Sequence, residues 1–99
     1  MMIDLSDKIA LVTGGASGIG RGICIVLGDQ GANVAVADIN IQGASDVASD
    51  LSARGPRSAA FDVDVTVRES VDRMVARVID EFGRIDILVN DAGIIGASE

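Results

Sequence analysis

Segments with the pattern of β-strands alternate with segments with the pattern of α-helices along almost the whole chain. Apolar runs predict strands at residues 8–13, 33–38, 58–63 and 85–90, and the intervening stretches predict helices at 18–30, 41–53 and 67–82. Strands separated by helices pair in parallel through right-handed crossovers, so the alternation predicts an α/β fold. The 99 residues suffice for one small domain. Its core is expected to be aliphatic, because the chain has two Phe and no Trp or Tyr, and this suits a parallel sheet covered on both faces.

The helix predicted at 67–82 has the clearest amphipathic pattern. Its apolar positions recur at helical spacing and are expected to face the sheet: Val67, Val71, Met74, Val75, Val78, Ile79 and Phe82. Gly55-Pro56 and Gly83 are expected to end the second and third helices. Gly22 and Gly28 fall inside the first helix, where each costs about 1 kcal/mol relative to Ala. We expect close packing of that helix against the sheet to explain them.

The first strand runs directly into a glycine-rich turn that opens the first helix. The turn reads Thr13-Gly14-Gly15-Ala16-Ser17-Gly18-Ile19-Gly20. Glycines permit a sharp turn and let the backbone approach a ligand closely, and the unpaired N–H groups and positive dipole end of the helix attract anions. The arrangement predicts a site for the pyrophosphate of a dinucleotide, although its spacing differs from the Gly-x-Gly-x-x-Gly fingerprint. Taken alone, the same turn is also compatible with a simple tight loop.

Three further stretches carry a resemblance to a known family. They read Val34-Ala-Val-Ala-Asp38, Asp62-Val-Asp64-Val65-Thr66 and Ile85-Asp-Ile-Leu-Val-Asn90-Asp91-Ala92-Gly93. With the glycine turn, they make the chain resemble the classical short-chain dehydrogenase/reductase (SDR) family from Leu5 to about Gly93. The resemblance implies a Rossmann-like doubly wound parallel sheet of four strands in the order 3-2-1-4, truncated after the fourth strand. Residues 1–99 would then be a partial NAD(P)-binding Rossmann domain, the N-terminal half of an SDR.

The resemblance also implies which residues contact the cofactor: Gly14, Ser17, Gly18, Ile19, Gly20, Asp38, Ile39, Asp64, Val65, Asn90, Ala92 and Gly93. Asp64 and Val65 would meet the adenine, and residues 90–93 would line the ribose and nicotinamide side. Two simpler interpretations stay open. Asp64 could be an acid near a helix N-terminus that Thr66 caps, and the segment after the fourth strand could be only a turn that closes it.

One residue departs from the family pattern. Asp91 stands where the Asn-Asn-Ala-Gly motif of the family has its second Asn. An acid at this position is expected to weaken a tie between neighbouring strands without removing the cofactor site.

The acid at the end of the second strand favours NAD over NADP. Asp38 follows Gly20 by 18 residues, close to the spacing of about 20 at which an acid accepts hydrogen bonds from the ribose hydroxyls. The same carboxylate would repel a 2′-phosphate. Family members that use NADP tend to carry Arg or Lys near the turn or after the second strand, and here those positions hold Ser17, Ile39 and Asn40. An ordinary solvated acid is the alternative interpretation of Asp38.

The resemblance implies an oxidoreductase that transfers hydride between NAD(H) and an alcohol or carbonyl substrate. The catalytic Ser, Tyr-x-x-x-Lys pair and helix Asn of the family lie downstream of the Asn-Ala-Gly segment. This chain has no Tyr, and its only Lys is Lys8. A Tyr phenol works as a general acid only when a nearby cation lowers its pKa, so we expect no catalytic residue and no activity in these 99 residues alone. The alternative is a non-catalytic, truncated nucleotide-binding or interaction module.

A remote alternative comes from another class of enzyme. The segment from Asp62 to Thr66 also fits the Asp-x-Asp-x-Thr pattern of haloacid-dehalogenase-like phosphotransferases, where both acids, here Asp62 and Asp64, hold Mg²⁺ and the first is the nucleophile. In those enzymes the motif ends the first strand of the core, whereas here it ends the third. No other metal site is expected, because the chain has no His and a single Cys.

Charge and composition narrow the choice of partners. The net charge of −7 argues against nucleic-acid binding, because no basic stripe is present to displace phosphate counterions. No signal-peptide pattern and no apolar run of membrane-spanning length are found. Cys24 can form no internal disulfide, and a reducing cytoplasmic location is the simplest expectation. The fourth strand is expected to expose an edge, through which the chain would self-associate.

Overall fold

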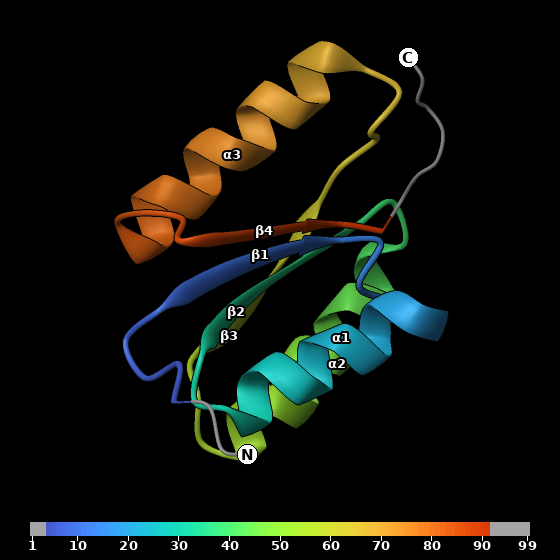
Figure 1. Cartoon of the computed structure of the whole chain (residues 1–99). Coiled ribbons are helices and arrows are strands. Elements are labelled where there is room, and N and C mark those ends of the chain that lie inside the picture. Colours follow the sequence, from blue (N-terminus) through green and yellow to red (C-terminus); the bar gives the residue numbers. More distant parts are fainter. Residues whose placement is uncertain (1–3, 92–99) are drawn as a thin grey trace.

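A computed structural model of the protein describes residues 4–91. Its elements are β1 (Ile9–Thr13), α1 (Gly18–Asp29), β2 (Asn33–Asp38), α2 (Ile41–Ala53), β3 (Ser58–Asp62), α3 (Arg68–Phe82) and β4 (Ile87–Asn90). All three strand pairs are parallel, and the order across the sheet is β3-β2-β1-β4 (Figure 1). The predicted Rossmann-like α/β fold and its strand order are therefore confirmed.

The sheet has helices on both faces, because successive strand residues point to opposite sides. Figure 1 shows α1 and α2 on one face and α3 on the other. On the side of α1 and α2, Val12 and Val36 pack with Leu51, and all three side chains are buried. On the side of α3, Leu11 packs with Val78. β1, β2 and β3 thus contribute side chains to both cores, whereas β4 contributes Ile87 and Val89 to the first core and leaves Leu88 exposed on the other face.

The register of the strands brings their carboxyl ends to one edge of the sheet. Thr13 of β1 lies opposite Ala37 of β2 and Asn90 of β4, and Asp38 lies opposite Asp62 of β3. The chain runs from β1 outward to β3, then crosses to β4 on the other side of β1. In open α/β sheets, ligands bind at such a change of direction, outside the carboxyl ends of the strands.

The ends of α3 and β4 differ slightly from the prediction. Val67, predicted inside the third helix, is its N-cap with extended backbone (φ −116°, ψ 113°). Gly83 ends the helix as predicted, in the left-handed conformation (φ 91°), and its N–H donates to Ile79 O. β4 begins at Ile87 rather than at residue 85. At Asp86 the backbone N–H donates to Ile9 O (2.8 Å), while the Ile9 N–H donates to the Asp86 carboxylate (2.8 Å) instead of to a backbone carbonyl of the next strand.

The explanation predicted for the two glycines inside α1 is wrong. A Cβ on Gly28 would lie 3.0 Å from Leu51 Cδ2 and 3.6 Å from Pro56 Cγ, so Gly28 permits close approach of α2 and the loop after it rather than of the sheet. A Cβ on Gly22 would meet no atom within 4 Å. Packing therefore gives no reason for a glycine at position 22.

Candidate functional site

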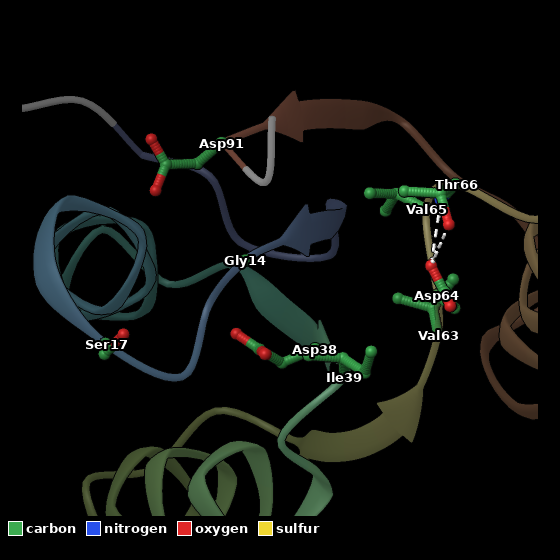
Figure 2. Close-up of a pocket in the computed structure, with 9 residues that line it drawn as sticks. All are labelled: Gly14, Ser17, Asp38, Ile39, Val63, Asp64, Val65, Thr66 and Asp91. Carbon is green, nitrogen blue, oxygen red and sulfur yellow. Dashed lines mark hydrogen bonds between the residues drawn. The ribbon is translucent and has the colours of Figure 1, made fainter. Parts of the chain in front are cut away.

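A pocket with a cavity volume of about 380 Å³ opens at the carboxyl ends of the strands. Figure 2 shows its lining: Gly14, Ser17, Asp38, Ile39, Val63, Asp64, Val65, Thr66 and Asp91. These residues lie at the carboxyl ends of the four strands or in the segments that follow them. Six of them belong to the predicted cofactor-binding set, namely Gly14, Ser17, Asp38, Ile39, Asp64 and Val65.

The glycine turn is pressed against the first turn of α1. Gly14 has a positive φ of 73°, and its N–H donates to Ala37 O at 2.8 Å. A Cβ on Gly20 would lie 2.0 Å from Gly14 O, which leaves no room for a side chain at that position. A Cβ on Gly15 would lie 2.9 Å from Val36 Cγ1 and 3.0 Å from Cys24 Sγ. The glycines at 15 and 20 are thus required by close approach.

The N-terminus of α1 has the properties of an anion site. Ser17 is its N-cap, but the Ser17 side chain makes no capping hydrogen bond, and the first turn carries no acidic residue. The N–H groups of a first helical turn have no partner within the helix, and the helix dipole adds partial positive charge there. Gly18, Ile19 and Gly20 form this turn, although none of them lines the pocket itself.

The carboxylate of Asp38 joins two loops at the pocket. Its Oδ2 accepts a hydrogen bond from the Ala16 N–H (3.0 Å), and its Oδ1 accepts one from the Asn40 N–H (2.9 Å). Figure 2 shows the carboxylate between the strand end and the Gly14–Ser17 loop. A carboxylate has about four acceptor positions, so two remain for hydroxyl donors of a ligand. None of the nine lining residues is basic.

Asp64 lies in a turn, not at the cap of a helix. Its Oδ1 accepts from the Thr66 hydroxyl (2.6 Å) and from the Thr66 N–H (3.0 Å), the bonds drawn in Figure 2. These two bonds, the hydroxyl first, lower the pKa of Asp64 below its usual value. The Asp64 N–H donates to Ser70 Oγ at 2.9 Å. The alternative with Thr66 as the N-cap is wrong, because Val67 holds that position.

The segment after β4 meets the glycine turn through Thr13. The Thr13 hydroxyl donates to Asn90 Oδ1 at 2.8 Å, and the Asp91 N–H donates to Thr13 O at 3.1 Å. Asn90 itself does not line the pocket, whereas Asp91 does. Ala92 and Gly93, also predicted to contact the cofactor, lie outside the described residues.

Sequence reasoning missed Val63, Thr66 and Asp91 as lining residues. Thr66 belongs to the segment Asp62–Thr66, which carries part of the family resemblance and fits the Asp-x-Asp-x-Thr pattern. Asp91 is the one departure from the family pattern. Either signal could have placed these two residues in the site. Val63, only 3% exposed, closes the floor of the pocket from the core side, and nothing in the sequence distinguishes it from other apolar strand residues.

The arrangement of acids does not favour a metal centre. Asp62 forms an ion pair with Arg77 (3.1 Å) and does not line the pocket that Asp64 lines. Between residues 4 and 91, no group of three or more His, Cys, Asp or Glu is placed to hold a metal ion. The Cys24 thiol is fully buried, and this burial raises its pKa to about 11. None of the helices in the same range is long and apolar enough to cross a membrane.

Comparison with known proteins gives the same family across almost the whole chain. The sequence model described as "short chain dehydrogenase" matches residues 8–99. Sorbitol dehydrogenase of Cereibacter sphaeroides is 46% identical over 90 residues, which are 91% of this chain and 34% of that protein. The 2,3-dihydro-2,3-dihydroxybenzoate dehydrogenase of Bacillus subtilis is 42% identical over 91 residues, 92% of this chain and 35% of that protein.

A solved structure agrees with these sequence matches. The crystal structure of hydroxysteroid dehydrogenase from Escherichia coli superposes with a TM-score of 0.87 and 36% identity, covering 91% of this chain and 38% of that chain. The chain thus spans about a third of the length of the relatives it matches. On the strength of the fold, the family model and these relatives, the chain belongs to the short-chain dehydrogenase family.

Proposed function

We propose that the pocket at the carboxyl ends of the strands binds NAD(H), and that this chain is the dinucleotide-binding part of an SDR oxidoreductase. The observation that carries the proposal is the position of Asp38. Its carboxylate stands at the pocket beside a helix N-terminus, keeps acceptor positions free, and has no basic residue among its lining neighbours. A diphosphate at α1 and a ribose diol at Asp38 use both features at once.

The remaining contacts follow from this placement. Asp64 and Val65 lie on the far wall of the pocket from the glycine turn, where the adenine would rest. Val65 is 39% exposed and offers an apolar surface for a planar ring. A cavity of this size falls within the range of about 300–1,000 Å³ typical of ligand pockets, and it suits the adenosine portion. The nicotinamide portion would extend toward residues 90–93.

Asp38 is proposed to select NAD over NADP by charge. The 2′-phosphate of NADP would come near the Asp38 carboxylate, and two like charges about 5 Å apart repel by roughly 3 kcal/mol at an effective dielectric constant of 20. Screening by solvent at this partly exposed site reduces the figure. The proposed preference is therefore about tenfold or more in the dissociation constant.

Titration calorimetry with NAD⁺ and NADP⁺ tests this proposal. The unmodified chain should bind NAD⁺ more tightly, and Asp38→Ala should weaken NAD⁺ binding and reduce the preference. Asp62→Ala is the matched control, because Asp62 lies beside Asp38 in the sheet but outside the pocket. Tighter binding of NADP⁺ to the unmodified chain, or equal effects of the two substitutions, would refute the assignment.

The reaction proposed for the protein as a whole is hydride transfer between NAD(H) and an alcohol or carbonyl substrate. Relatives named for sorbitol, D-threitol and galactitol 2-dehydrogenase activity support a hydroxylated small molecule as the substrate class. The 99-residue chain alone is proposed to be inactive, because it has no Tyr. Its only Lys, Lys8, directly precedes β1, at the amino ends of the strands and therefore away from the pocket at their carboxyl ends. We propose a cytoplasmic location, which the buried single Cys24 suits.

An activity assay tests the proposed inactivity, and an extended chain distinguishes the second candidate, a non-catalytic nucleotide-binding module. A panel of secondary alcohols and polyols should give no NAD⁺ reduction above background with the purified chain. Turnover that survives repurification and disappears in Asp38→Ala would overturn the proposed inactivity. Both candidates are expected to bind nucleotide without turnover. Extending the chain with residues that supply a Tyr-x-x-x-Lys pair would give turnover only if the chain is part of an enzyme.

A further inference from the structure

The carboxylate of Asp91 lies against the helix end that is proposed to hold the pyrophosphate. Asp91 Oδ2 is 3.0 Å from the position that a Cβ on Gly20 would occupy, in the first turn of α1. Figure 2 shows Asp91 over the end of α1, on the other side of Gly14 from Asp38. A negative charge from the segment after β4 is thus brought to a helix end that has no acid in its own first turn.

The backbone that carries this carboxylate is fixed. The Asp91 N–H donates to Thr13 O at 3.1 Å, and the Thr13 hydroxyl donates to the Asn90 side chain at 2.8 Å. Both bonds attach the segment to the last residue of β1, directly before the glycine turn. The charge of Asp91 therefore stays near the first turn of α1 unless the side chain rotates.

A carboxylate and a phosphate compete for the same end of a helix. In the ligand-free protein, a negative charge near the N-terminus of α1 is favourable, because it interacts with the helix dipole. When a pyrophosphate occupies that end, the same charge repels it. An Asn at this position, as in the motif that the sequence resembles, would carry no charge, so the competition depends on the acid that this chain has there.

We propose that Asp91 is an affinity- and specificity-determining residue that weakens the binding of ligands in proportion to the phosphate charge they place at α1. The inference rests on the proposed function, because it concerns the same site. The effect of Asp91 on ligand binding is opposite to that of Asp38. The Asp38 carboxylate accepts hydrogen bonds that a ribose donates, whereas the Asp91 carboxylate faces a diphosphate, which is also negatively charged. The ligands that report this difference are ADP-ribose, with a diphosphate, and adenosine, with none.

The expected effect is a change in affinity that depends on the ligand. Asp91→Asn keeps the shape of the side chain and removes its charge, and it should tighten ADP-ribose and NAD⁺ binding by roughly 10- to 100-fold at low ionic strength. Added salt should shrink the difference between the variants, because it screens the repulsion. Adenosine binding should change by no more than about twofold. The ligand-free Asp91→Asn protein should melt at a lower temperature than the unmodified chain, since the favourable charge at α1 is lost.

The experiment compares the unmodified chain, Asp91→Asn, Asp91→Ala and the control Asp80→Asn. Asp80 is exposed in the last two turns of α3, near the amino ends of the strands, so its substitution changes the net charge equally but far from the pocket. Each protein is titrated with ADP-ribose and with adenosine at low and high ionic strength, and its ligand-free melting curve is recorded. Selective tightening of ADP-ribose by both Asp91 variants, absent in Asp80→Asn, supports the inference.

The remaining outcomes overturn it in distinguishable ways. Equal affinities of the unmodified chain and both Asp91 variants for ADP-ribose refute the role of Asp91 and leave the proposed function standing. Equal tightening by Asp80→Asn shows a general effect of net charge and refutes it too. If neither the unmodified chain nor any variant binds ADP-ribose or NAD⁺, both the proposed function and this inference are refuted.

Discussion

Replacing Gly20 by Ala tests whether the glycine turn and α1 form one rigid unit. A Cβ at this position would lie 2.0 Å from the carbonyl oxygen of Gly14. That carbonyl belongs to a turn whose backbone is held by hydrogen bonds from the Gly14 and Gly15 N–H groups to Ala37 O. The obstructing atom is therefore backbone that cannot rotate away as the end of a flexible side chain can.

The cost of Gly20→Ala can be worked out from this geometry. Ordinary van der Waals contacts of a Cβ lie at 3.4–4 Å, so the turn and the helix must separate by more than an ångström. Forcing extra atoms into a packed site costs about 1–3 kcal/mol or more, while Ala in place of Gly within a helix returns about 0.5–1 kcal/mol. We expect a net loss of about 1–2 kcal/mol, which in a chain of this size lowers the melting temperature by roughly 4–16 °C.

Gly22→Ala is the matched control two residues further along the same helix. A Cβ on Gly22 would meet no atom within 4 Å, so only the gain in helix propensity remains, about 0.5–1 kcal/mol. Urea unfolding followed by far-ultraviolet circular dichroism gives both free energies of unfolding. NAD⁺ titration of the same two proteins should show binding retained in Gly22→Ala and lost or strongly weakened in Gly20→Ala.

The two substitutions must change stability in opposite directions. Equal stability of Gly20→Ala and Gly22→Ala would mean that the turn yields freely and that the close approach at Gly20 is not a constraint on the fold. Retained NAD⁺ affinity in a destabilised Gly20→Ala protein would show that NAD⁺ binding does not depend on the packing at Gly20, and would refute the predicted loss of binding.

Three further predictions concern other parts of the molecule. The pKa of Asp86 is lowered, chiefly by the Ile9 N–H, so its contribution to stability is present above the unfolded value near 3.8 and is lost as the pH falls below it; acid titration should show a smaller loss below about pH 4 in Asp86→Asn than in the unmodified chain. Cys24, fully buried and with its pKa raised to about 11, should react with a thiol reagent at pH 8 far more slowly in the folded protein than in urea. Leu88→Lys should reduce self-association in sedimentation of the 99-residue chain, because Leu88 is 65% exposed on a strand that pairs only with β1 in the described sheet, and an unmodified chain that stays a monodisperse monomer would contradict this.

The sequence predicted the architecture because the periodicity of each segment is set by the same burial that forms the sheet. Strand and helix types were all correct, and the strand order implied by the family resemblance is confirmed. Element ends were less predictable. Val67 fits the apolar stripe of α3, yet it is the N-cap and 42% exposed, because the chain turns at residues 64–67, where the Val67 N–H donates to Asp64 O at 3.0 Å, and the helix begins only after this turn.

The site was predictable to the extent that it depends on positions at strand ends. Asp38, Asp64 and the glycine turn meet in one pocket because the parallel register aligns the carboxyl ends of the strands. The contacts between loops were not predictable, since the hydrogen bond from the Ala16 N–H to Asp38 depends on how two segments 22 residues apart are placed in space. The same holds for Gly28, whose neighbour Leu51 is on α2.

The three carboxylates of the pocket differ in how their charge is balanced, and this difference predicts what a ligand must bring. Asp38 and Asp64 each accept two hydrogen bonds from neighbouring backbone or hydroxyl groups. Asp91 instead lies against the first turn of α1, so its charge is balanced by the helix dipole. A ligand with hydroxyl and amino donors can add to the first two carboxylates without displacing their partners. A ligand with a diphosphate must take the helix end away from Asp91, and the free energy of that exchange sets how tightly the site can bind it.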